Sequence, residues 1–341
     1  MKRASTRDVA LRAGVSKTTV SHVINQTRVV EESTRQRVLQ AIAELGYRPN
    51  LLARSLTTNQ TGIIGMLISD SSNYFFGQAI QGVEGVLLPE NYGLMVCDTQ
   101  NMLDLEEHYL NLLLSQRVDG IIAAAASQRW VELYRADEQR TPVVFMDRCF
   151  ENMDWPFVGV DNQDGAYQGV RHLIDGGHTT IGLLAGYELL STMRDRQAGY
   201  EKALVEAGLP VCADWIVRSG LTIEDGRRAM CQLLSAPERP QAVFINNSML
   251  AMGALRGLHD AGLRCPDDMR LVAFDDHPWT EVSDPPLTVV RQPTIQMGAT
   301  AAQILLGLTH DEHQTPADTR IILPCELVVR CSSQRPDCHA P

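Results

Sequence analysis

Short apolar runs alternate with helical patterns over most of this chain, from residue 61 onward. The first run, IIGMLIS at 63–69, is continuously apolar, which is typical of a strand buried on both faces of a sheet. Later runs include VVFM at 143–146, AVFI at 242–245 and LVAF at 271–274, with helical segments between them. Repeated β-α units require mostly parallel sheets with helices on both faces, so the pattern predicts an α/β core.

The β-α units are too numerous for one small sheet, so we expect two similar lobes that divide near residue 162. A chain of 341 residues also has room for two or three domains of about 100 to 200 residues each. The predicted organisation is an all-α domain at 1–48, a linker at 49–60, lobe 1 at 61–161 completed by 291–320, lobe 2 at 162–290 completed by 321–333, and a tail at 334–341.

Three short helical patterns separated by turn signals precede the core. Thr6 is expected to cap the first helix, which Gly14 ends, and Ser16 is expected to cap the second. A third helix is expected at 32–45, where Gly46 is placed to end it. Because the joint AGVS is a short turn with glycine at its bend, the first two helices have the form of a helix-turn-helix pair.

The second helix has a polar face suited to DNA. An apolar stripe at positions 20, 23 and 24 must face the helical core, so the polar positions of the same helix face outward. They carry a cation, hydroxyls and an imidazole, which can reach base edges or phosphates in the major groove. The outward residues are Lys17, Thr18, Ser21 and His22. The alternative is an ordinary three-helix cap in which these side chains are only solvated.

The charge distribution favours the DNA-binding interpretation. Residues 1–60 contain ten basic and four acidic side chains, a net charge of +6. The whole chain carries −11, which leaves −17 on residues 61–341. A basic N-terminal region attracts a polyanion such as DNA, whereas the acidic remainder repels it.

These features resemble the LacI/GalR family of bacterial transcription regulators. The matching segments are DVALRAGVSKTTVSHVIN, YRPNLLARSL and TGIIGMLISD, and TTVSHVIN is similar to the ribose-repressor and purine-repressor branch. The resemblance covers nearly the full length. It implies a homodimer that binds palindromic operator DNA, most simply as a repressor, and a core similar to a periplasmic sugar-binding protein whose two lobes close on a small ligand.

The resemblance also implies a hinge helix. LLARSL at 51–56 is too short to be a stable helix alone, and in the family this segment pairs across the dimer and inserts a leucine into the minor groove. Leu56 stands at that position; the alternative is that Leu52 and Leu56 pack on the core. The predicted DNA-contacting residues are Thr6, Ser16, Lys17, Thr18, Thr19, Ser21, His22, Asn25, Arg54 and Leu56.

Polar and aromatic residues follow several of the apolar runs. Ligands of open α/β sheets bind beyond the carboxyl ends of the strands, so these residues are candidates for a ligand site. Guanidinium, carboxylate and amide groups can engage vicinal hydroxyls, and aromatic rings can stack on a sugar. The predicted ligand-binding residues, which match the family's pocket positions, are Phe75, Phe76, Asp147, Arg148, Arg196, Asn247 and Asp275. The alternatives are that the two phenylalanines belong to the core and that Asp276 is a turn or capping residue.

The chain departs from the family pattern at two cleft positions. Many relatives have Asn-Asp where this chain has Asn247 and Ser248, and proline is common where Tyr74 stands. The ligand of a close relative therefore does not transfer directly. We expect a small metabolite, a sugar such as ribose or a sugar derivative, with a purine or nucleoside as the alternative. No cofactor is expected, and eight scattered cysteines without a C-x-x-C pair do not indicate a metal site.

Two other classes of protein are less consistent with the sequence. An enzyme of a common type is not indicated, because we find no G-x-S-x-G elbow, no P-loop and no G-x-G-x-x-G after a strand. A secreted sugar-binding receptor without a transcriptional role would need a signal segment, which MKRASTRDVA does not resemble. No apolar run approaches the ~20 residues of a membrane span. We therefore expect a cytoplasmic protein, and a dimer because the tail lacks a leucine heptad.

Overall fold

The computed structural model describes residues 4–25, 28–47, 60–125, 141–150, 155–310 and 319–334. The chain forms two compact units, Met1–Thr61 and Gly62–Pro341. In the described residues, no helix has the length and hydropathy needed to cross a membrane.

In its described residues, the N-terminal unit contains three short helices, α1 (Thr6–Ala13), α2 (Lys17–Asn25) and α3 (Glu32–Leu45). Left-handed glycines follow two of them, Gly14 with φ 68° and Gly46 with φ 56°, as the sequence predicts. The helices enclose a small core of buried side chains: Val9, Ala10, Ala13, Val20, Val23, Val38 and Ala41. The apolar stripes of the three helices therefore converge on one core, and the polar side of α2 is left outside.

The cap of α1 differs from the prediction by one residue. Ser5, not Thr6, precedes the helix, and it forms a capping box with Asp8. Thr6 is the first helical residue, and its hydroxyl lies 2.9 Å from the Tyr47 hydroxyl. The prediction at Ser16 is confirmed, because its Oγ accepts a hydrogen bond from the backbone N–H of Thr19 at 3.0 Å.

The described part of the larger unit contains two six-stranded sheets, which have the same pattern of strand order. The first sheet has the order β11-β5-β4-β3-β1-β2, and the second has the order β12-β10-β9-β8-β6-β7. Every pairing among the described strands is parallel except that of β12 with β10, so the predicted parallel architecture is confirmed. The strands are β1 (Ile63–Ile68), β2 (Gly93–Asp98), β3 (Gly120–Ala123), β4 (Val143–Met146), β5 (Phe157–Val160), β6 (Ile181–Leu184), β7 (Ile216–Val217), β8 (Ala242–Ile245), β9 (Arg270–Phe274), β10 (Thr288–Arg291), β11 (Arg320–Leu323) and β12 (Glu326–Val328).

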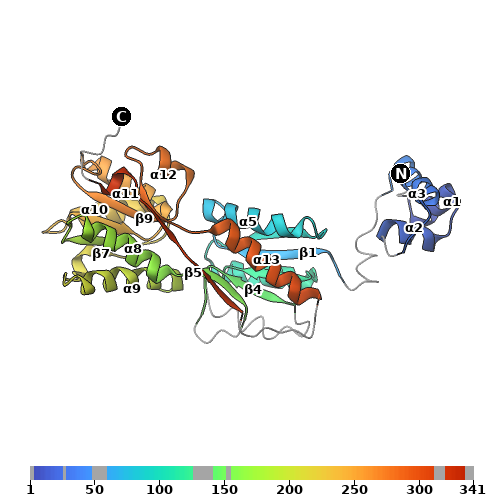
Figure 1. Cartoon of the computed structure of the whole chain (residues 1–341), viewed down its shortest axis with the longest axis horizontal. Helices are drawn as coiled ribbons and strands as arrows, with labels where there is room; N and C mark the ends of the chain where they lie inside the picture. Colours follow the sequence, from blue (N-terminus) through green and yellow to red (C-terminus); the bar gives the residue numbers. More distant parts are fainter. Residues whose placement is uncertain are drawn as a thin grey trace. The chain divides into compact units, whose positions relative to one another are not determined.

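Helices cover both faces of each sheet, and each sheet with its helices forms one lobe. In lobe 1, α5 and α13 lie side by side on one face, and α6 packs on the other face (Figure 1). In lobe 2, the pair α8 and α9 covers one face and the pair α10 and α11 covers the other (Figure 1). The helices are α5 (Tyr74–Leu87), α6 (Leu103–Ser115), α8 (Asn162–Asp175), α9 (Ser191–Glu206), α10 (Ile223–Leu234), α11 (Ser248–Asp260), α12 (Pro278–Val282) and α13 (Thr294–His310).

Among the described residues, three segments cross between the lobes, after β5, after β10 and after β11. The strand pairing places the third crossing later than the predicted boundary at 320/321, because Arg320–Leu323 pairs with Phe157–Val160 in lobe 1. Pro324 then ends β11, and β12 pairs with β10 in lobe 2. The segment 321–329 reads IILPCELVV, in which Pro324 and Cys325 separate two short strands that pair with different sheets.

Candidate functional site

One cavity lies at the carboxyl ends of strands from both lobes, and all seven predicted ligand-binding residues line it. We call this cavity the cleft. Eight other residues also line it: Ser69, Asp70, Asn73, Asn101, Thr192, Met193, Leu221 and Gln292. Asn101 and Gln292 follow β2 and β10, so the rule that predicted the other positions also applies to them. Thr192 and Met193 lie in the first turn of α9, beside the predicted Arg196.

Phe75 and Phe76 belong both to the core and to the cleft. Asn73 caps α5 by accepting a hydrogen bond from the Phe75 N–H at 3.0 Å, which fixes the start of the helix at the cleft edge. The two rings lie edge to face with centroids 5.1 Å apart, and both are buried in the core of lobe 1. The core interpretation and the stacking interpretation are therefore compatible.

Lobe 1 contributes a buried pair of opposite charges. The Arg148 Nε lies 3.6 Å from a carboxylate oxygen of Asp147, and the Arg148 Nη1 donates to the Asn101 Oδ1 at 2.7 Å. Burial raises the pKa of Asp147, an effect that the charges of Arg148 and Arg196 oppose. Burial likewise lowers the pKa of Arg148, against the charges of Asp147 and Glu106. The pair is thus held in a poorly solvated place, where a polar ligand would interact strongly with it.

Lobe 2 positions Arg196 through several contacts at once. Its side chain is almost fully buried, with the guanidinium carbon 3.6 Å from the centre of the Phe274 ring. The Nε donates to the Asn162 Oδ1 at 2.8 Å, and the Nη1 donates to the Asn246 carbonyl at 2.5 Å. These contacts fix the plane of the guanidinium, as bidentate recognition of a ligand requires.

Asp275 and Asn247 complete the lobe 2 side of the cleft. The Asp275 carboxylate accepts a hydrogen bond from the Gln292 Nε2 at 2.6 Å, so β9 and β10 deliver an acceptor and an amide to the same place. The Asn247 Oδ1 caps α11 by accepting from the Leu250 N–H at 2.8 Å. The amide nitrogen of Asn247 is therefore the part of that side chain suited to a ligand.

The cleft holds polar atoms whose hydrogen-bonding capacity the protein does not use. Within the described residues, the Ser69 Oγ, the Arg148 Nε and the Gln292 Oε1 are buried and have no hydrogen-bond partner. Buried polar groups are usually paired, because leaving one unpaired costs about 1 to 3 kcal/mol. A ligand with several donors and acceptors would satisfy these atoms.

Asp276 has a structural role outside the cleft. Its two carboxylate oxygens each accept from Arg330, both at 2.9 Å, and Arg291 and Thr280 also donate to them. Burial alone would raise the pKa of Asp276, but these hydrogen bonds lower it below its ordinary value. The alternative that placed Asp276 in a turn is therefore closer to the structure than a ligand role. Asp276 ties Arg330, which follows β12, to the loop before α12.

The predicted DNA-contacting residues fall into three groups. Lys17, Thr18 and Ser21 are exposed on α2, and His22 is half-buried. The hydroxyls of Ser16 and Thr19 lie 2.9 Å apart, so both take part in the cap of α2. Asn25 is the last residue of α2, whereas Arg54, Leu56 and nearly all of the linker lie outside the described residues.

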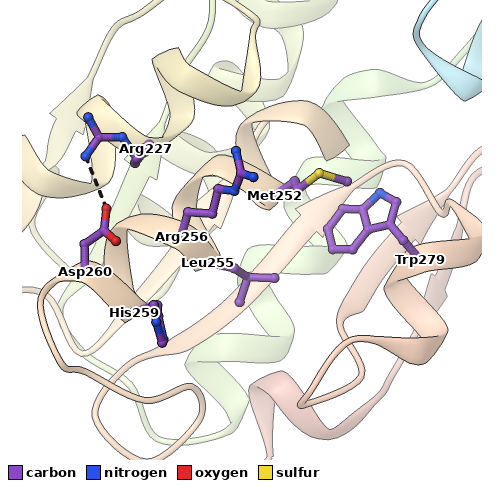
Figure 2. A pocket seen from close by; sticks show the side chains of 7 residues that line it. All are labelled: Arg227, Met252, Leu255, Arg256, His259, Asp260 and Trp279. Carbon is purple, nitrogen blue, oxygen red and sulfur yellow. Dashed lines mark hydrogen bonds and ion pairs between the residues drawn. The ribbon is translucent and has the colours of Figure 1, made fainter.

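A second, larger hollow of about 560 Å³ opens on the surface of lobe 2. Figure 2 shows the side chains that line it: Arg227 is paired to Asp260, and Met252, Leu255 and Trp279 are among the others. None of the predicted ligand-binding residues lines it. Size alone does not identify a ligand site, and the buried charges and unpaired polar atoms favour the cleft.

Comparisons with known proteins agree with this arrangement. Residues 5–50 match the family described as bacterial regulatory proteins, lacI family, and residues 170–333 match a periplasmic binding protein-like domain. The HTH-type transcriptional repressor PurR of Photobacterium profundum is 37% identical over 332 residues, which cover 96% of this chain and 98% of that protein.

Two solved structures extend the likeness to the whole chain. The lac repressor dimer bound to operator and the anti-inducer ONPF has a TM-score of 0.87 and 28% identity, and it covers 98% of this chain and 100% of that one. The complex of the transcriptional regulator CelR with cellobiose has a TM-score of 0.74 and 30% identity, with 97% and 100% covered.

Proposed function

The chain belongs to the LacI family of bacterial regulatory proteins, and we propose that it is a dimeric DNA-binding transcriptional repressor whose operator affinity is set by a small molecule in the cleft. Like its relatives, it is a transcriptional regulator and not an enzyme. One observation carries the ligand-binding part of the proposal: residues predicted from five separate strand or helix ends line a single cavity between the lobes.

The N-terminal unit supplies the operator contacts in this proposal. Lys17, Thr18 and Ser21 form the exposed polar face of α2, the second helix of the helix-turn-helix pair. Such a helix reads the major groove, with residues of its first turns at the base edges. The linker at 49–60 is proposed to act as a hinge, with Arg54 and Leu56 at the minor groove.

We propose a sugar as the class of effector. The cleft presents three carboxylates, two guanidinium groups and several amides, which suit a ligand with many hydroxyls. Among its described lining residues, the aromatic ones are Phe75 and Phe76 from lobe 1, whereas lobe 2 adds the aliphatic Met193 and Leu221. An aromatic surface on one side of the cleft suits the apolar face of a sugar ring. A planar base would be better held between two aromatic rings.

A purine or nucleoside is the second candidate. The observation in its favour is the identity of 37% to repressors named PurR, over nearly the full length of both chains. Amide and carboxylate groups such as those of Asn247 and Asp275 can also pair with the edges of a base. The two candidates differ in which analogues should bind, so a ligand panel separates them.

Control of the operator is proposed to act through the lobes. A ligand that contacts both lobes favours their closed arrangement, and the three crossing segments are the places where the lobes can turn. In a dimer, such a movement would change the spacing of the two hinge segments. A coupling of about 1 to 3 kcal/mol would change operator affinity by roughly 5- to 150-fold.

Thermal unfolding across a panel of pentoses, hexoses, sugar acids, nucleosides and purines tests this proposal. Ribose or a related sugar should raise the melting temperature of the unmodified protein. The same sugar should leave the melting temperature of Arg196→Ala unchanged, because the substitution removes the guanidinium fixed by Asn162 and Asn246. Stabilisation by purines alone would transfer the proposal to the second candidate. An equal shift in Arg196→Ala would remove Arg196 from the site.

A further inference from the structure

An aromatic contact joins the two lobes at the edge of the cleft. The ring of Tyr74, the first residue of α5 in lobe 1, meets the ring of His277, just before α12 in lobe 2. The ring centroids are 5.3 Å apart and the planes are inclined by 63°, which is an edge-to-face arrangement. Tyr74 is 43% exposed and His277 only 5%, so a partly exposed ring of lobe 1 contacts a buried ring of lobe 2.

His277 is held in place by lobe 2. Its Nε2 lies 3.1 Å from the Oγ of Ser248, the first residue of α11, and it directly follows Asp275 and Asp276 in the chain. Burial lowers the pKa of His277, and the carboxylates of Asp275 and Asp276, the charged groups that face it, oppose this effect. The imidazole therefore links the loops that carry Asp275 and Asn247, and it offers its ring to lobe 1.

A second contact between the lobes lies elsewhere on the cleft. The Cys149 N–H of lobe 1 donates to the Ser191 Oγ of lobe 2 at 3.2 Å. Cys149 directly follows the cleft residue Arg148, and Ser191 is the first residue of α9. This hydrogen bond forms only when the lobes lie close together, so its amide proton reports on their closure.

We propose that Tyr74 is a positioning residue that holds the lobes closed through His277, and that it thereby sets how tightly the cleft retains its ligand. The effect on the ligand rests on the proposed function of the cleft, whereas the effect on the lobes does not. The observations that carry the proposal are the ring contact across the lobes, the burial of only one partner, and the anchor at Ser248.

Hydrogen exchange of the ligand-free protein tests the contact itself. The Cys149 amide should exchange about 3- to 10-fold faster in Tyr74→Ala, the factor expected for loss of one aromatic pair. Tyr74→Phe should exchange at the rate of the unmodified protein, because it keeps the ring. Amides of β8 should be unchanged in both variants, which shows that lobe 2 remains folded.

A matched control exists within lobe 1. His108 and Tyr109 on α6 form a ring pair with the same centroid distance, 5.3 Å, and an interplanar angle of 66°. His108→Ala removes that pair without touching the lobe boundary and should leave the Cys149 amide unchanged. The proposal would be overturned if the Cys149 amide exchanged at the same rate in Tyr74→Ala as in the unmodified protein. It would also be overturned if Tyr74→Phe or His108→Ala accelerated this exchange as much as Tyr74→Ala does.

A calorimetric titration with ribose as the probe tests the consequence for the ligand. Tyr74→Ala should bind ribose about 3- to 10-fold more weakly, since part of the binding energy must then close the lobes. Equal affinity in Tyr74→Ala and the unmodified protein would overturn the link to ligand retention. Failure of ribose to bind the unmodified protein would instead count against the proposed sugar site, while the exchange rates still decide the contact between the lobes.

Discussion

Asp147 and Asp275 occupy equivalent positions in the two lobes and share an unusual backbone conformation. Each follows the third strand from the end of its sheet, β4 or β9, and each has a positive φ, 69° and 76° respectively. The N–H of Asp147 donates to the Val158 carbonyl and that of Asp275 donates to the Val290 carbonyl, both at 2.9 Å. The same turn thus places one carboxylate on each side of the cleft, and both lobes retain a strained conformation there.

The positive φ at Asp275 leads to a prediction about stability. Asp275→Ala and Asp275→Gly both remove the carboxylate, but only glycine adopts this backbone conformation without strain. We expect Asp275→Ala to be less stable than Asp275→Gly by about 1 kcal/mol, measured by urea unfolding. Equal stability of the two variants would show that the turn is not strained.

Close packing of α5 against α13 leads to a prediction with an internal control. A Cβ at Gly82 would overlap the Ile295 carbonyl, whereas a Cβ at Gly85 on the same helix would meet no atom within 4 Å. Gly82→Ala should therefore destabilise the protein by about 1 to 3 kcal/mol, because the helices must separate. Gly85→Ala should stabilise it by about 0.5 to 1 kcal/mol through higher helix propensity. Thermal melts that move in the same direction for both variants would contradict this packing.

Burial of His277 predicts a pH dependence of stability. Its pKa in the folded protein lies below the ordinary value of about 6.5, so the unfolded chain binds more protons in that range. The free energy of unfolding should then fall as the pH is lowered from 7 through the folded pKa. His277→Gln should reduce this loss, but not abolish it, since burial also lowers the pKa of His172. Denaturant titrations at several pH values measure the difference, and an unchanged slope in His277→Gln would refute the assignment.

Exposed residues of α2 predict two different effects on DNA binding. Lys17→Ala should weaken binding to all operator sequences and lower the salt dependence by about one counterion, because a cation acts on phosphates. Thr18→Ala should instead relax base preference at one position of each half-site, by about 1 kcal/mol for one hydrogen bond. Selection from a randomised operator library at two salt concentrations separates these outcomes. A library preference unchanged in Thr18→Ala would contradict a base contact there.

Many of the residues that line the cleft can be predicted from the sequence because of a property of parallel sheets. Their strands all end at one edge, so polar residues after apolar runs, such as Asp147 and Asp275, must meet there. Gln292 obeys the same rule, but the sequence does not reveal it, because its strand β10 reads TVVR and lacks the continuous apolar run of β4 or β8. The contact between Tyr74 and His277 could not be predicted, because it depends on how the lobes meet and not on any local pattern.

The predicted ends of two elements differ from the structure because neighbouring residues carry nearly the same local signal. Ser5 and Thr6 are adjacent hydroxyl residues that can both cap a helix, and only the backbone conformation selects Ser5. In the same way, the predicted boundary at 320/321 lies three residues before the end of β11, because only the strand pairing shows that 320–323 belongs to lobe 1 and 326–328 to lobe 2. These differences move boundaries by a few residues and leave the arrangement of the cleft unaffected.

Operator affinity measured by fluorescence anisotropy, with and without the effector found in the ligand panel, tests the link between cleft and DNA most directly. For the unmodified protein we predict a change of roughly 5- to 150-fold on addition of the effector. Arg196→Ala should bind the operator with the affinity of the ligand-free protein whether or not the effector is present. An unmodified protein that binds its operator equally well with the cleft occupied and empty would contradict control of DNA binding by the cleft.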